Sequence, residues 1–266
     1  MKSFQQITLL LLTAAACAAP ARAADASADE IVKRSLESFY YAGNSMRARV
    51  SMKLINRQGN VREREMTILR LNLGNSGDQR YYIYFHGPAD VKRTSFLIWK
   101  YPAKDDDRWI YVPTLKLVKR ISVDDKRSSF VGSDFTYEDL SGRDLEDETR
   151  VLVRKEDLAG RPTYVIESKP KTPSDYSRRL SWIDRERWLP LKEEYFDARN
   201  EPLRTYTADK LEQIGGQWSV TVRSMKNLQS GHRTEVVFRE TEYGVGIKQD
   251  IFTERYLRDA PAQWVR

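Results

Sequence analysis

The sequence is poor in the side chains that most often carry chemistry, with one cysteine and two histidines in 266 residues. The cysteine, Cys17, lies in an N-terminal stretch that we expect to be removed, so the predicted mature chain has none. This absence excludes disulfides, thiol nucleophiles and thiolate metal sites together. Neither His86 nor His232 has neighbours at a metal-ligand spacing, so we expect ordinary surface or strand-end histidines and no metal.

Motifs of the common enzyme classes are also missing. The sequence has no Gly-x-Ser-x-Gly nucleophile elbow and no glycine-rich phosphate loop. Acidic pairs occur at residues 105–107, 124–125 and 138–139, but adjacent residues of a strand point to opposite faces, so solvated loop charge explains them better than catalysis. We therefore predict a protein that is not an enzyme and needs no cofactor, with a lipid hydrolase as the least implausible enzymatic alternative.

Only the N-terminus has a long apolar run. Lys2 precedes an apolar stretch at residues 7–19, and Ala21-Arg22-Ala23 supplies small residues, which is typical of a secretory signal peptide. We expect residues 1–23 to be cleaved and the product to be periplasmic. Lipidation at Cys17 is the alternative, but Ala14 stands where a large aliphatic residue would be expected.

Cleavage after Ala23 would leave 43 basic and 38 acidic residues, a net charge of +5. An exported protein with a mild positive charge can be attracted to anionic lipid head groups. Nucleic acid is the other common partner of basic chains, but the export signal and the even mixing of charge signs argue against it.

The clearest structural signal is strict alternation in residues 45–54. Met46, Val50, Met52 and Leu54 share one face, as does Ala48, while the other face is charged or polar. This pattern predicts a strand with one buried face. A helix precedes it, because Ser27 and Glu30 have capping-box spacing and apolar residues follow at helical intervals up to Tyr40.

Short turn-rich connections separate the later strand-like segments, so neighbouring strands should pair antiparallel. We predict a mainly β (α+β) fold in which residues 24–266 form one domain. It has roughly ten or eleven strands, a number that favours curling. An N-terminal helix and short lid helices would then cover the apolar concave face.

Residues 108–140 contain the most distinctive stretch of the sequence. Residues 108–112 read as a short aromatic strand in which Trp109 and Tyr111 face something apolar. The stretch ends in a loop that bends at Gly132 and enters a short helix, with Ser133 or Asp134 as the expected N-cap. Phe130, Phe135, Tyr137 and Leu140 would form an apolar underside, which predicts a movable lid.

The same stretch resembles the outer-membrane lipoprotein-sorting protein family, in the superfamily of the periplasmic lipoprotein carrier LolA. The resemblance lies in Trp109-x-Tyr111-x-Pro113 and in Ser129-Phe130-x-Gly132-Ser133-Asp134-Phe135-x-Tyr137-x-Asp139-Leu140. It continues in residues 88–97, in Trp182-Ile183-Asp184 with Trp188-Leu189-Pro190, and in Phe252-Thr253.

This resemblance implies an open antiparallel half-barrel that binds rather than catalyses. We interpret the chain as a monomeric carrier that shields the acyl chains of a lipid or lipoprotein on the way to the outer membrane. Relatives of the family act beside resistance-nodulation-division (RND) exporters, which implies an inner-membrane exporter as donor and an outer-membrane acceptor. The expected cavity and lid residues are Met46, Val50, Met52, Leu54, Trp109, Tyr111, Phe130, Phe135, Tyr137 and Leu140.

Two alternatives stay open at this point. A sealed core has the same alternation as a carrier cavity, although the 14 Tyr, 9 Phe, 6 Trp and 5 Met residues favour a surface that repacks around apolar guests. A regulatory sensor that binds lipoproteins and signals to a membrane protein would use a related fold.

Overall fold

The computed structural model describes residues 26–74, 77–102 and 104–266. The expected cleavage site after Ala23 and the alternative lipidation site at Cys17 lie outside these residues. The helices are α1 (Ala28–Tyr40), α2 (Tyr137–Ser141), α3 (Glu254–Arg258) and α4 (Ala262–Val265), with 3-10 turns η1 (Pro113–Leu115), η2 (Val123–Arg127), η3 (Leu145–Asp147) and η4 (Gln249–Ile251).

The strands form one antiparallel sheet of thirteen members in the order β6-β5-β4-β3-β2-β1-β13-β12-β11-β10-β9-β8-β7. They are β1 (Ser45–Ile55), β2 (Val61–Leu73), β3 (Asp78–Gly87), β4 (Ser95–Lys100), β5 (Asp107–Val112), β6 (Leu117–Ile121), β7 (Glu148–Leu158), β8 (Arg161–Pro170), β9 (Arg178–Asp184), β10 (Pro190–Phe196), β11 (Pro202–Ile214), β12 (Gln217–Asn227) and β13 (Arg233–Tyr243). The prediction of a mainly β, curled, open antiparallel sheet is confirmed.

The expected number of ten or eleven strands was too low. One strand that the sequence pattern did not mark is β6, an edge strand whose side chains are exposed or half-buried. Because an edge strand needs no apolar face and often carries lysine, its basic sequence shows little of the alternation that marks a buried strand.

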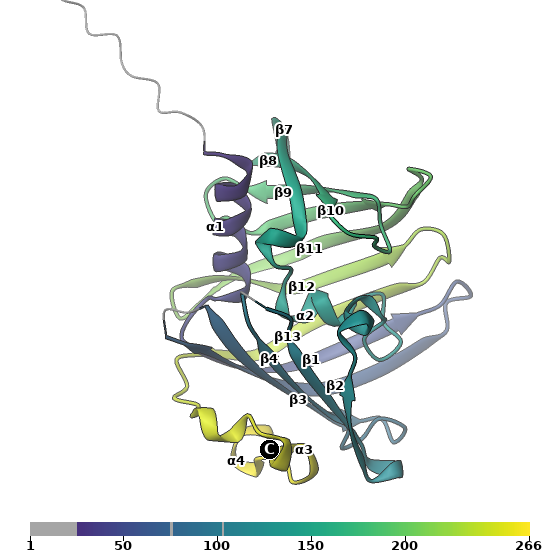
Figure 1. Cartoon of the computed structure of the whole chain (residues 1–266), viewed down its shortest axis with the longest axis vertical. Coiled ribbons are helices and arrows are strands. Elements are labelled where there is room, and N and C mark those ends of the chain that lie inside the picture. Colours follow the sequence, from purple (N-terminus) through teal and green to yellow (C-terminus); the bar gives the residue numbers. More distant parts are fainter. Residues whose placement is uncertain (1–25, 75–76, 103) are drawn as a thin grey trace, which may run out of the picture.

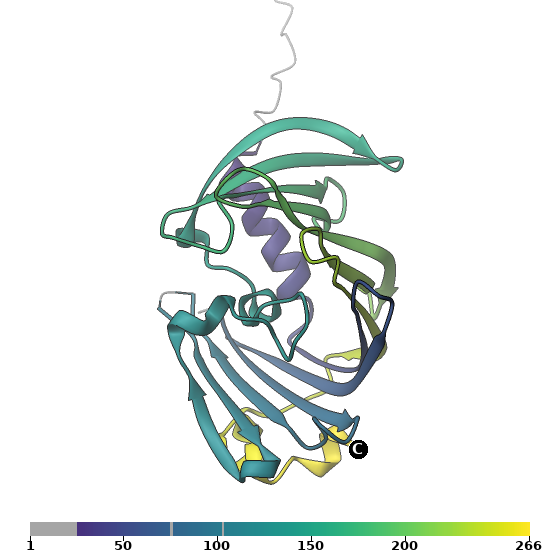
Figure 2. The same ribbon diagram turned by 90° about the vertical axis from the view of Figure 1, so that its right-hand side faces the viewer.

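The two edge strands, β6 and β7, are consecutive along the chain but lie at opposite ends of the sheet. The connection between them runs through η2, α2 and η3 and crosses the inner side of the curl (Figure 2). Figure 2 also shows α1 on this inner side. The sheet is therefore a half-barrel whose hollow is covered by α1 and by the segment that joins its two edges.

Helix α1 forms where the sequence predicts it. The Ser27 side chain accepts a hydrogen bond from the Glu30 backbone N–H at 3.2 Å, and Ile31 and Val32 are buried against residues of β8 and β9. This cap satisfies one of the donors that the first turn leaves free. The buried side of α1 fixes the helix along one half of the hollow (Figure 1).

The C-terminal segment covers the opposite, outer face of the sheet at β2 to β5 (Figures 1 and 2). Ile251, Phe252 and Leu257 are almost fully buried there against Leu69, Tyr82 and Leu97, residues of β2, β3 and β4. The sequence analysis did not anticipate this second layer. No helix within the described ranges is both long and apolar enough to span a membrane.

Candidate functional site

The floor of the hollow is the inner face of β1 and its neighbours. Met46, Val50, Met52 and Leu54 are each at most 8% exposed and belong to one apolar cluster, as the alternation predicts. Val50 lies opposite Met66 of β2 on one side and Phe238 of β13 on the other. The apolar floor therefore extends across the centre of the sheet.

The roof is residues 129–140, which we call the lid segment. Phe130 and Phe135 are 2% and 6% exposed and belong to the same cluster as the floor, against which Tyr137 and Leu140 also pack. The Phe130 ring lies 5.9 Å from that of Phe85 and 5.1 Å from that of Phe96. The expected apolar underside is present.

The expected N-cap of the lid helix was wrong by a few residues. Thr136 caps α2, and its hydroxyl accepts from the Asp139 N–H while the Asp139 carboxylate accepts from the Thr136 N–H. Asp134 instead reaches the turn between β12 and β13. Its carboxylate accepts from the Thr234 hydroxyl at 2.8 Å and lies 2.7 Å from Nδ1 of His232.

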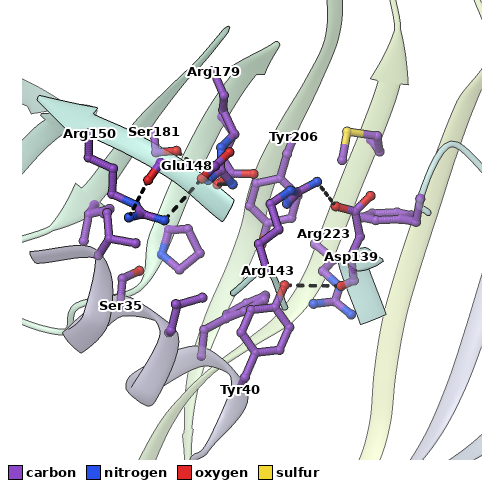
Figure 3. A pocket seen from close by; sticks show the side chains of 18 residues that line it. Ser35, Tyr40, Asp139, Arg143, Glu148, Arg150, Arg179, Ser181, Tyr206 and Arg223 are labelled. Carbon is purple, nitrogen blue, oxygen red and sulfur yellow. Dashed lines mark hydrogen bonds and ion pairs between the residues drawn. The ribbon is translucent and has the colours of Figure 1, made fainter. Parts of the chain in front are cut away.

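A buried ionic network holds the other end of the lid segment. Arg143 donates to Asp139 at 2.7 Å (Figure 3). It also lies 3.0 Å from Glu138, and Arg204 of β11 lies 4.0 Å from Asp139. All four side chains are at most 7% exposed. Helix α2 is therefore fixed by charge as well as by apolar contact.

The network extends along the wall formed by β7, β9 and β10. Glu148 lies 2.8 Å from Arg179, and Arg179 contacts Glu193 at 3.0 Å (Figure 3). The hydroxyls of Tyr176 and Tyr195 donate to Glu148 and Glu193, respectively. One side of the hollow is thus lined by neutralised pairs of charges rather than by apolar side chains.

These contacts shift the pKa of the buried acids. Burial raises the pKa of Asp139, but the guanidinium groups of Arg143 and Arg204 outweigh it, and the pKa ends well below its ordinary value. Burial also raises the pKa of Glu148, but the positive charges of nearby arginines, chiefly Arg179 and Arg143, outweigh this effect. The pKa of Glu148 is therefore lowered as well. Both carboxylates are ionised at neutral pH.

Two small cavities lie under α1 and the lid segment. The first, of about 60 Å³, is lined by residues of α1, of the lid segment and of the ionic wall, and the second, of about 70 Å³, is lined more by apolar residues. Phe39, Tyr40 and Arg223 line both, so the cavities adjoin. Small-molecule pockets are usually several hundred Å³. The hollow is therefore nearly filled by its own side chains.

A larger cleft of about 440 Å³ lies beside them, between α1 and the residues that follow α2. Its lining includes Leu36, Tyr40 and Arg143, which also line the first cavity. These three side chains separate the cleft from the hollow. A movement of α1 or α2 would join the two spaces.

Eight of the ten expected site residues gather at the hollow. Met46 and Leu140 line the second cavity and Phe135 the first, while Val50, Met52, Leu54, Phe130 and Tyr137 pack in the same apolar cluster. Whether any of the eight contacts a ligand stays a prediction.

Trp109 and Tyr111 do not lie at the hollow, contrary to expectation. They pack in the outer cluster with Phe252 and other residues of the C-terminal segment. Ile110, between them, packs against the inner cluster. Alternation shows that Trp109 and Tyr111 share a face, but it does not show which face of the sheet is concave.

The sequence analysis missed the polar residues of the hollow, including Arg143, Glu148, Arg179, Tyr206 and Arg223. A usable signal exists for Arg223, because it alternates with Thr221 and Met225, and both of these are buried. A charged residue among buried positions of a strand indicates either a partner or a ligand.

Comparisons with known proteins show which family model and which solved structures this chain resembles. A family model described as "Uncharacterized protein" matches residues 77–259. A search of curated proteins finds no match. An outer membrane lipoprotein-sorting protein domain from Vibrio parahaemolyticus is similar over 87% of this chain and 98% of its own, with 29% identity and a TM-score of 0.80.

Two further solved structures are similar. A DUF1329 family protein from Desulfovibrio piger has 29% identity and a TM-score of 0.78, over 85% of this chain and 95% of its own. A LolA superfamily protein from Nitrosomonas europaea has 19% identity and a TM-score of 0.66, over 87% of this chain and 100% of its own. The last of these similarities concerns the fold alone.

Proposed function

We propose that this chain, which belongs to the family whose model matches residues 77–259 and is similar to an outer membrane lipoprotein-sorting protein domain, is a periplasmic carrier that shields acyl chains during transport towards the outer membrane. The mature carrier would begin at Ala24, after removal of residues 1–23. Its cargo would be a lipid or an acylated lipoprotein. The proposal that an RND-type exporter is the donor and that an outer-membrane protein is the acceptor rests on the family resemblance alone.

The observation that carries this proposal is an apolar floor facing an apolar roof across an unclosed sheet. The floor belongs to the sheet, whereas the roof belongs to a connection without strand partners in the sheet. The roof can therefore separate from the floor without disrupting the ladder of strands. A sealed core would need no such covering segment between two unpaired edges.

Burial of the cargo supplies the driving force. Each buried methylene contributes about 0.8 kcal/mol, so a chain of about 15 carbons offers about 12 kcal/mol before ordering costs. Because the present cavities total far less than a usual ligand pocket, loading must expand the hollow. The larger cleft beside α1 is the most direct route by which a chain can enter.

The test is binding by the protein purified from the periplasm and then stripped of lipid by solvent. Native mass spectrometry before stripping should show bound acyl compounds, and the stripped protein should take up a fluorescent fatty acid. The absence of both bound lipid and uptake would contradict a carrier. A protein partner captured equally with and without lipid would favour the sensor instead.

A matched pair of variants locates the binding. Leu140→Asp places a carboxylate in the second cavity and should lower fatty-acid affinity by about tenfold or more, because a charge in an apolar site disfavours apolar cargo. Leu115→Asp, at a side chain that is 68% exposed, should leave affinity unchanged. Both variants should keep a cooperative thermal transition, which separates lost binding from lost folding.

A further inference from the structure

Arg223 of β12 lines both cavities. Figure 3 shows it among the side chains of the first. Its guanidinium carbon lies 5.3 Å from the ring centre of Phe39, 5.7 Å from Phe135 and 4.7 Å from Phe238. These rings come from α1, the lid segment and β13. The cation is therefore surrounded by aromatic faces at the junction of roof and floor.

Arg223 has no hydrogen-bond or ion-pair partner among the described residues, and its Nε is buried and unsatisfied. The other arginines that line the two cavities are all partnered. Arg143, Arg150 and Arg179 pair with carboxylates at 2.7–3.1 Å, and Arg70 donates to backbone carbonyls of residues 40–43. A half-buried cation without an anion is costly unless something else supplies the anion.

The nearby acids are already neutralised. Glu193 lines the first cavity, but it contacts Arg179 and accepts from Ser181 and Tyr195. Asp139 also lines that cavity and is held by Arg143. Neither carboxylate lies within 4.0 Å of a nitrogen of Arg223. Among the described residues, neither of these carboxylates therefore neutralises the guanidinium group of Arg223.

Two buried hydroxyl groups that have no hydrogen-bond partner among the described residues also line the cavities. The Tyr206 hydroxyl is buried without a partner and belongs to a side chain that is 5% exposed and lines the first cavity (Figure 3). The Thr241 hydroxyl is likewise unsatisfied and lines the second cavity. Burial raises the pKa of Tyr206, so its hydroxyl keeps its proton and can donate.

We propose that the hollow selects an amphiphile with one anionic oxygen head group, held by Arg223 and Tyr206, with its acyl chain along the apolar second cavity. The head group is a carboxylate, as in a free fatty acid, or a phosphate, as in a lysophospholipid. A guanidinium and a hydroxyl are suitable donors for either. The ester and amide groups of an acylated cysteine carry no charge and would leave Arg223 unneutralised.

This inference rests on the proposed carrier function and names its cargo class. The test uses lipid-stripped protein and displacement of a neutral fluorescent acyl probe by hexadecanoic acid, hexadecanol and a single-chain lysophosphatidic acid. Native protein should bind the acid or the phosphate about tenfold or more tighter than the alcohol, because hydrogen bonds to charged groups are the strong ones. The ratio of the affinities for hexadecanoic acid and for lysophosphatidic acid shows whether the site prefers a carboxylate or a phosphate.

Variants assign the preference to Arg223. Arg223→Gln should bring the ratio of acid affinity to hexadecanol affinity close to one, whereas Arg223→Lys should retain part of the preference. Arg233→Gln, at a 47% exposed side chain paired with Glu235, is the matched control and should behave like native protein. If Arg223→Gln fails to fold, Tyr206→Phe removes only a hydroxyl and should lower the ratio of acid affinity to alcohol affinity severalfold.

The possible outcomes distinguish failure of this inference from failure of the proposed carrier function. Equal affinity of native protein for acid, phosphate and alcohol would overturn the anionic head group while leaving an acyl carrier intact. An anion preference that survives in both Arg223→Gln and Tyr206→Phe would overturn the assigned residues. Failure of all three compounds to displace the probe, or of the probe to bind, would overturn the carrier itself.

Discussion

At the scale of single residues, Asp139 combines two tasks that are usually separate. It completes the capping box of α2 and it neutralises Arg143 and Arg204 in the interior. Loss of the Asp139 carboxylate would therefore remove a partner from the cap of α2. It would also take from the guanidinium groups of Arg143 and Arg204 a negative charge that neutralises them. Removing one partner of a buried ion pair is far more costly than removing an exposed one.

We expect Asp139→Asn to lower the free energy of unfolding by about 3 kcal/mol, measured by urea denaturation at pH 7. The control is Glu242→Gln, because that side chain is 58% exposed and 3.9 Å from Arg47, and it should cost less than about 0.5 kcal/mol. Equal losses in the two variants would contradict a structural role for the buried network.

The same variant has a pH signature. The pKa of Asp139 is lower in the folded state than its ordinary 3.8, so its contribution is present above pH 3.8 and is lost as the pH falls towards the folded value. Stability of the native protein should fall steeply below about pH 4. Asp139→Asn should show a shallower fall, and an identical slope in both proteins would exclude Asp139 as the titrating group.

Residues of the hollow differ in how far the sequence could predict them. Met46, Val50, Met52 and Leu54 were predictable because a strand places alternate residues on one face. Trp109 and Tyr111 were misplaced because the outer face is also covered, so apolar alternation occurs on both sides of β5. Arg223 was missed because its neighbours in space come from α1, the lid segment and β13, which are distant in sequence.

At the scale of elements, the lid segment is anchored at two points. Asp134 is bound to His232 and Thr234, and Asp139 is bound to Arg143 and Arg204. The sequence predicted the lid and its apolar residues from local composition. It could not predict the contacts of Asp134, because contacts between residues about 100 positions apart leave no local pattern.

A reversible disulfide tests whether this segment opens. Asp134 and Thr234 are suitable positions, because their side chains are in contact, and a Cys17→Ser background removes the natural cysteine. Oxidation of Asp134→Cys/Thr234→Cys should slow uptake of a fluorescent fatty acid by about tenfold or more, because the segment can no longer open locally. Reduction should restore uptake.

The single variants Asp134→Cys and Thr234→Cys are the controls, since the first loses the contacts with His232 and Thr234, the second loses the contact with Thr234, and neither can form the disulfide. Uptake by either should be at least as fast as by native protein. If the oxidised double variant takes up lipid at the native rate, the lid segment is fixed and α1 is the element that moves.

At the scale of the whole molecule, the sheet is both the scaffold and the container. Its outer face is covered by the C-terminal segment at β2 to β5, and its inner face forms the hollow that α1 and the lid segment cover. Curling could be predicted from the number of strands. The extent to which side chains fill the hollow could not be predicted, because a packed core and an expandable cavity need the same apolar positions.

Chain length distinguishes an expandable hollow from a packed core. We expect the affinity for straight-chain alcohols to rise about fourfold per added methylene, because each buried methylene is worth about 0.8 kcal/mol, and then to level off when the hollow is full. The measurement is displacement of the neutral acyl probe by alcohols of increasing length, which keeps Arg223 out of the comparison.

The same series should shift thermal unfolding. A ligand that binds only the folded state, at one hundred times its Kd, stabilises by about 2.7 kcal/mol, which corresponds to a Tm increase of about 5–10 °C for a chain of this size. At one fixed concentration of alcohol, the Tm increase should grow with chain length and stop growing where affinity levels off. An affinity that rises without a limit, with no accompanying Tm increase, would indicate adsorption to the outside of the molecule, and the hollow would then be a packed core.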